Sequence, residues 1–131
     1  AIVGAGPPLR GEGREEALTA FYEHFLAQDW DWFRIPDQSA SGLKPFLDLA
    51  RREKDFGPRV LKVQIAGPVS FGQSVRTPDG KNILDDPELA DTVVKGLGAK
   101  AAWLAVQVQQ TGRIPLIFFD EPGLTGFGSA F

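Results

Sequence analysis

Two adjacent carboxylates, Asp120 and Glu121, are the residues of this sequence best suited to bind a charged ligand. They directly follow six apolar residues at positions 114–119. A short apolar run of this kind is typical of a buried strand, so the first carboxylate leaves the strand at a partly buried edge. An unpaired charge there is costly unless a cation or a hydrogen-bond donor meets it. The sequence therefore predicts that this edge binds a cationic group. The alternative is that the carboxylates cap the next helix or accept hydrogen bonds from loop amides.

A second group of candidates lies around the end of the clearest predicted strand, 60–66. The Gly-Pro-Val-Ser segment that follows it could bring backbone amides and a hydroxyl close to a ligand, or simply redirect the chain. Gln64, on the polar face of that strand, could point into a ligand site or fill a polar core layer. The candidate binding residues here are Gly67, Pro68, Ser70 and Gln64.

A third loop, Gly4-Ala5-Gly6-Pro7, follows the short apolar start of the chain. Glycine permits a tight turn and proline ends strand pairing, so Gly4 and Ala5 are expected at the end of a strand. The loop has no third glycine at dinucleotide-motif spacing and no Gly-Lys-Ser/Thr, so neither a Rossmann nor a P-loop fingerprint is present.

Several kinds of chemistry are excluded within these residues by composition. Cysteine is absent, so there is no disulfide, thiolate nucleophile or cysteine-bound zinc. The one histidine, His24, has no cysteine or second histidine nearby, and it is expected to be solvated or packed because a metal site needs convergent ligands. We assign no catalytic residue and no metal ligand from the sequence.

Charge and hydropathy limit the partners. Fourteen Lys and Arg against seventeen Asp and Glu give a net charge of −3, without a basic tract for nucleic acid. No apolar run approaches the ~20 residues of a membrane-spanning helix. The sequence starts without a basic segment leading into an apolar stretch, so we expect a cytoplasmic protein. The absence of methionine at position 1 suggests processing or a longer product.

Hydrophobic periodicity predicts the elements that position these groups. Helices are expected at 14–28, from 41 to 54 and from 87 to about 111, with Asp86 as N-cap of the last. Strands are expected around 2–3, 30–35, 60–66 and 114–119. This alternation is typical of a parallel α/β sheet, and four strands with three helices correspond to half of an eightfold barrel.

The motifs at 62–70 and 117–124, Lys-Val-Gln-Ile-Ala-Gly-Pro-Val-Ser and Ile-Phe-Phe-Asp-Glu-Pro-Gly-Leu, resemble the C-terminal barrel of cobalamin-independent methionine synthases. That superfamily also contains uroporphyrinogen decarboxylases. The resemblance implies that residues 1–131 are the N-terminal half of a (β/α)8 TIM barrel, with the second half outside the sequence. It also implies a methyltransferase that moves a methyl group to a zinc-activated, homocysteine-like thiol.

Within this resemblance, Asp120 matches the residue that contacts the amino group of the substrate. The zinc ligands are expected beyond Phe131. Ala5, Ser74 and Gly126 stand where the family has a serine and two folate contacts, so the methyl donor is expected to be either a folate or a methyl-corrinoid. The alternatives are a decarboxylase, with Arg34 and Arg76 as candidate carboxylate-binding residues, and a non-catalytic half-barrel fragment.

Overall fold

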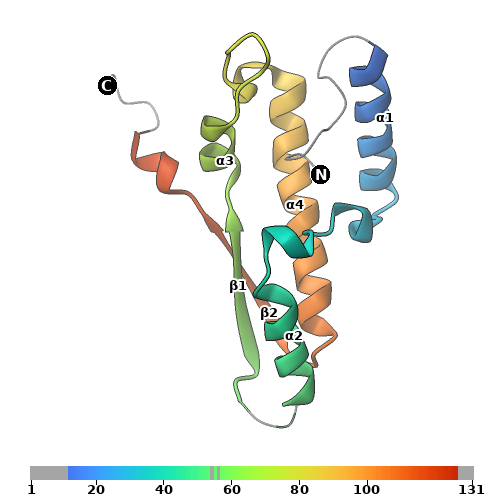
Figure 1. Cartoon of the computed structure of the whole chain (residues 1–131), viewed down its shortest axis with the longest axis vertical. Coiled ribbons are helices and arrows are strands. Elements are labelled where there is room, and N and C mark those ends of the chain that lie inside the picture. Colours follow the sequence, from blue (N-terminus) through green and yellow to red (C-terminus); the bar gives the residue numbers. More distant parts are fainter. Residues whose placement is uncertain (1–11, 54, 56, 127–131) are drawn as a thin grey trace.

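Two parallel strands, β1 (Val60–Ala66) and β2 (Ile114–Asp120), carry the candidate site at their carboxyl ends (Figure 1). The structure, a computed structural model, describes residues 12–53, 55 and 57–126. The strands are in register from the pair Val60 and Ile114 to the pair Ala66 and Asp120. The other elements are α1 (Glu12–Leu26), η1 (Trp30–Phe33), η2 (Asp37–Ser39), α2 (Leu43–Arg52), α3 (Pro68–Ser74), η3 (Ile83–Asp85), α4 (Pro87–Gln109) and η4 (Pro122–Gly126).

The long helix α4 lies between the strands and α1 (Figure 1). It begins as the sequence predicts: Asp86 caps the helix by accepting from the backbone N–H groups of Glu88 and Leu89, and Pro87 occupies the first turn. The face of α4 toward β1 and α2 forms a core with them, made of Leu47, Ala50, Leu61, Val63, Leu104 and Val108. This packing covers most of one face of the two-stranded sheet, and Phe119 at the carboxyl end of that face stays 46% exposed.

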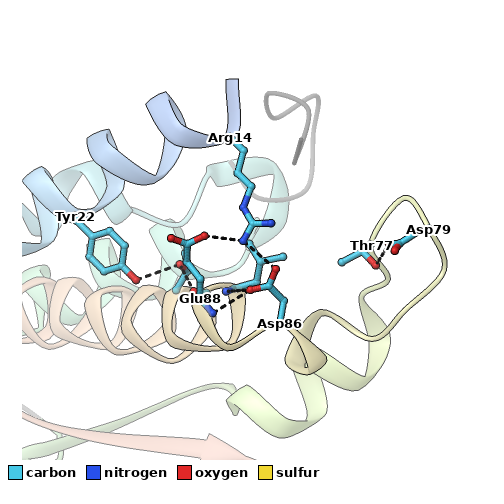
Figure 2. A network of polar contacts seen from close by, with 8 residues as sticks. Arg14, Tyr22, Thr77, Asp79, Asp86 and Glu88 are labelled. Atoms are coloured by element: carbon cyan, nitrogen blue, oxygen red, sulfur yellow. Dashed lines mark hydrogen bonds and ion pairs between the residues drawn. The ribbon is translucent and has the colours of Figure 1, made fainter. Parts of the chain in front are cut away.

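The N-terminal half of α4 is joined to α1 by polar contacts. Arg14 donates to Asp86 at 2.9 Å and to Glu88 at 2.6 Å, and the Tyr22 hydroxyl donates to Asp91 at 2.6 Å (Figure 2). Phe21 of α1 packs against Phe33 of η1 and Ala99 of α4 in a separate apolar cluster. These contacts hold α1 against the side of α4 that faces away from the strands.

The prediction of half a (β/α)8 barrel is wrong. In the described part of the chain the sheet has only two strands, and β/α units do not alternate. The predicted strand at 30–35 is instead the 3-10 turn η1, while the predicted strand at 2–3 lies outside the described residues. Half of an eightfold barrel would need four adjacent parallel strands separated by helices, and the described residues form two.

The run Trp30–Phe33 forms η1 because its aromatic side chains pack on α1, with Phe33 buried deepest. Only Phe33 in the Trp30–Phe33 run is buried, so the two-residue alternation of a strand is absent. Phe33 packs edge to face on Phe21, with ring centroids 5.3 Å apart. Its carbonyl oxygen accepts from the Lys100 amine at 2.9 Å instead of from a neighbouring strand.

The remaining predicted elements agree with the structure, with shifted ends. Helices α1 and α2, predicted at 14–28 and 41–54, lie within a few residues of those positions. Strand β1 matches its prediction, and β2 extends one residue further, to Asp120. Among the described helices, none is long and apolar enough to cross a membrane.

Candidate functional site

The site is built where β1 and β2 end and α3 and η4 begin. The backbone N–H of Gly67, the first residue after β1, donates to the carbonyl oxygen of Asp120, the last residue of β2, at 2.8 Å. This bond continues the parallel ladder by one step, so the two strands stay in register up to the edge. The loops that leave the strands therefore start side by side.

The Glu121 carboxylate joins these two loops. Its Oε1 accepts from the backbone N–H of Val69 at 3.0 Å, and its Oε2 accepts from the N–H of Ser70 at 2.7 Å and from the Ser70 hydroxyl at 2.8 Å. The Ser70 oxygen in turn accepts from the N–H of Gly123 at 2.9 Å. We call Gly67, Val69, Ser70, Glu121 and Gly123 the Glu121 cluster.

The cluster leaves no space for a side chain at position 67. A Cβ atom there would overlap the carboxyl group of Glu121. Glycine is required at position 67 because the Glu121 carboxylate passes close to the Gly67 backbone on its way to the first turn of α3. Pro68 occupies the first position of α3, where its missing N–H costs no hydrogen bond.

The pKa of Glu121 is lowered overall. Desolvation acts in the opposite direction and raises it, but the N–H groups of Ser70 and Val69 and the Ser70 hydroxyl bind the charged form and outweigh that effect. Glu121 is therefore an ionised hydrogen-bond acceptor at neutral pH, and its oxygens are already engaged with the chain. It does not form an acid/base pair with Asp120.

Asp120 differs from its neighbour. Its side chain follows the alternation of Leu116 and Phe118 along β2, which places it on the sheet face opposite α4. It is half-buried, and among the described residues none donates a hydrogen bond or forms an ion pair with its carboxylate. Its backbone oxygen accepts from Gly67, so the carboxylate projects from a bonded strand end and has no partner within the described ranges 12–53, 55 and 57–126.

The same sheet face carries an exposed apolar surface with one cation. The side chains of Ile114, Leu116 and Phe118 are each about half exposed, at 57%, 45% and 46%. The Lys62 ammonium lies 4.9 Å from the centre of the Phe118 ring and also donates to Gln64. Gln64 is exposed on this face, as its place on the polar side of the strand predicts.

The structure thus brings together most of the residues selected from the sequence. Gly67, Pro68, Ser70 and Glu121 meet at one edge, with Asp120 beside them and Gln64 two residues before the end of β1. Gly4 and Ala5 lie outside the described residues. Arg34 and Arg76, the candidates for carboxylate binding, are exposed and far apart in the chain, on the segment after η1 and next to a turn.

Sequence reasoning missed helix α3 and the residues that it contributes. Gln73 on α3 donates to the carbonyl oxygen of Gly123 at 3.4 Å, and Gly72 packs so closely against Leu84 that a Cβ would overlap it. Proline directly after glycine is a helix-start signal that could have revealed α3. The bond between Glu121 and residues about fifty positions earlier has no comparable signal.

The residues described here do not fit a zinc site. The chain has no cysteine and one histidine, and the part that the structure describes contains no group of three or more His, Cys, Asp or Glu that could hold a metal. His24 is instead bonded to Asp29 at 2.8 Å and stacked on Trp32.

Comparison of the chain with protein-family models gives no match, and comparisons with curated proteins and with solved structures also give none.

Proposed function

We propose that Asp120 binds the ammonium group of an amino-acid thiol in a methyltransferase that methylates the sulfur of that thiol. The observation that carries the proposal is the half-buried Asp120 carboxylate at the edge of the sheet, which pairs with no other residue that the structure describes and whose backbone oxygen is bonded to Gly67. A carboxylate in such a position is stabilised when a cation replaces the water that it has lost. The sequence motif around Asp120, with its resemblance to methionine synthases, supplies the reaction class.

In this reaction the thiol gives its proton to solvent and its sulfur electron pair forms a bond to the methyl carbon. The bond between that carbon and the donor breaks at the same time, and its electron pair stays on the donor, where a folate nitrogen then takes up a proton and a corrinoid cobalt keeps the pair. The donor is a methylated folate or a methyl-corrinoid. Asp120 does not react; it orients the substrate through its ammonium group so that the sulfur has one position relative to the sheet edge. Orientation of this kind raises the rate by removing rotational freedom before the reaction.

The experiment measures binding of L-homocysteine to the full-length protein by calorimetry. 4-Mercaptobutanoate, which has the same thiol and carboxylate but no ammonium group, serves as the matched ligand. We expect homocysteine to bind at least about tenfold more tightly than this analogue, a difference typical of one charged hydrogen bond. We expect Asp120→Asn to remove that preference, because a neutral amide does not attract the cation.

Asp31→Asn is the control variant, because Asp31 is an exposed carboxylate on η1, away from the sheet edge. It is expected to bind both ligands like the unchanged protein. Equal affinity of the Asp120→Asn variant and the unchanged protein for homocysteine would exclude the proposed role. Binding of uroporphyrinogen in place of either thiol would favour the decarboxylase alternative.

A further inference from the structure

Glu121 stands next to the proposed ligand-binding carboxylate, but its own oxygens are occupied by the chain. Both oxygens accept hydrogen bonds from Val69 or Ser70, and the Gly67 backbone lies against the carboxyl group. A carboxylate that accepts several N–H and O–H bonds would have to give them up to bind a ligand. The Glu121 side chain is therefore unsuited to direct substrate contact.

The backbone of Glu121 is held as firmly as its side chain. On one side, the Asp120 carbonyl oxygen accepts from Gly67 at 2.8 Å; on the other, the Glu121 carbonyl oxygen accepts from the N–H of Leu124 at 3.1 Å. The peptide group between Asp120 and Glu121 is thus enclosed by bonds to the start of α3 and to η4. The direction in which the Asp120 side chain leaves the backbone depends on this peptide group.

From this geometry we infer that Glu121, together with Ser70, is a positioning residue that fixes the direction of the Asp120 carboxylate. This inference rests on the proposed function, because the direction of the Asp120 carboxylate affects activity only if a ligand binds there. Ser70 contributes by bridging: its hydroxyl donates to Glu121 and accepts from Gly123.

The cluster also connects the site to the body of the protein. Helix α3 carries Ser70 on one side and packs Gly72 against Leu84 on another. Leu84 packs against an apolar cluster formed by Ile83 of η3 and three residues in the first half of α4, Leu89, Val93 and Leu97. Asp120 is therefore positioned relative to α4 through α3, in addition to the direct pairing of β2 with β1.

The test uses Glu121→Gln in the full-length protein, with Glu23→Gln, an exposed residue of α1, as the matched control. Glutamine retains one acceptor oxygen and presents an NH₂ group to the second donor, so one of the bonds from Val69 or Ser70 is lost. The two readouts are the NMR chemical shift of the Asp120 carboxyl carbon without ligand and the affinity for L-homocysteine. A merely structural role would lower the melting temperature and leave both readouts of the folded protein unchanged.

We expect the Asp120 carboxyl signal to move in Glu121→Gln, and homocysteine to bind at least about fivefold more weakly, which corresponds to roughly 1 kcal/mol. The Glu23→Gln control is expected to change neither. If Asp120→Asn weakens binding while Glu121→Gln changes neither readout, the positioning role is refuted and the proposed function stands. If the Asp120 signal moves but Asp120→Asn binds normally, the positioning is correct and the proposed function fails.

Ser70→Ala provides a milder version of the same test. It removes the hydroxyl bridge and keeps both backbone N–H bonds to Glu121, so a smaller change in the same direction is expected in both readouts. If Glu121→Gln does not fold, Ser70→Ala decides the question: an unchanged Asp120 signal and unchanged affinity would overturn the inference.

Discussion

At the scale of single residues, the two carboxylates at the end of β2 show how one backbone step separates different roles. Asp120 lies on the open face without a described partner, whereas Glu121 turns to the first turn of α3 and accepts three hydrogen bonds. The difference arises because successive side chains of an extended chain point in opposite directions. In this adjacent pair of acids, one carboxylate is therefore bonded to the chain and the other is left without a partner among the described residues.

Gly67 gives the sharpest prediction at this scale. Gly67→Ala is expected to destabilise the protein by about 1–3 kcal/mol, because its Cβ would displace the Glu121 carboxyl group. Urea denaturation followed by circular dichroism measures the change. Gly98→Ala is the matched control: a Cβ there meets nothing within 4 Å, and alanine in the helix interior is expected to stabilise by up to about 1 kcal/mol. Equal stabilities of the two variants would contradict this account of the cluster.

At the scale of elements, the start of α4 depends on a charged cap shared with α1. Asp86 accepts from two backbone N–H groups and from Arg14 (Figure 2). These contacts lower the pKa of Asp86, with the Leu89 N–H as the largest cause and Arg14 next. Since the pKa of the folded state lies below that of the unfolded chain, the charged carboxylate stabilises the fold above about pH 4. This stabilisation is lost as the pH falls through the lower, folded-state pKa.

Asp86→Asn tests this cap without removing it, because asparagine is also a good N-cap residue. The variant is expected to show a smaller drop in urea midpoint between pH 7 and pH 3 than the unchanged protein, since it has no carboxylate to protonate at this position. Asp31→Asn serves as the control and is expected to keep the full drop. The idea fails if Asp86→Asn and the control respond to pH in the same way.

The sequence predicted those elements whose signals are local. Asp86 and Pro87 predict the start of α4. The alternation of apolar and polar residues from Leu61 to Gln64 predicts β1. The predicted strand at 30–35 failed because its aromatic residues do not alternate between two faces. Trp32 and Phe33 pack edge to face on Phe21, which lies on α1, and no local pattern predicts that contact.

At the scale of the whole molecule, one face of the sheet is largely covered, with Phe119 at its carboxyl end still 46% exposed, and the other face is open. Helices α2 and α4 pack on Leu61 and Val63, while Ile114, Leu116 and Phe118 remain about half exposed on the other face. Parallel sheets usually have both faces covered. A contiguous exposed apolar surface is a place where hydrophobic molecules bind.

The open face of the sheet is expected to bind an apolar dye. We expect the folded protein to bind the dye 8-anilinonaphthalene-1-sulfonate, and Leu116→Thr to lower its fluorescence by at least about a third, because it interrupts the apolar surface at its centre. Threonine is also favoured in strands, so the fold is expected to persist. Val94→Thr is the control, since Val94 is 54% exposed on α4 and away from the sheet. Similar fluorescence in both variants would show that the dye binds elsewhere.

By itself, the sequence determined the parallel strands, the boundaries of the long helix within a few residues and the position of two carboxylates at a strand end. These features depend on residue periodicity and capping, which act over a few neighbouring positions. Only the tertiary structure decided that the described strands number two and that Glu121 binds the backbone of α3. It also decided which sheet face is open. These features depend on contacts between residues about fifty or more positions apart, and their energies arise from packing that no local segment contains.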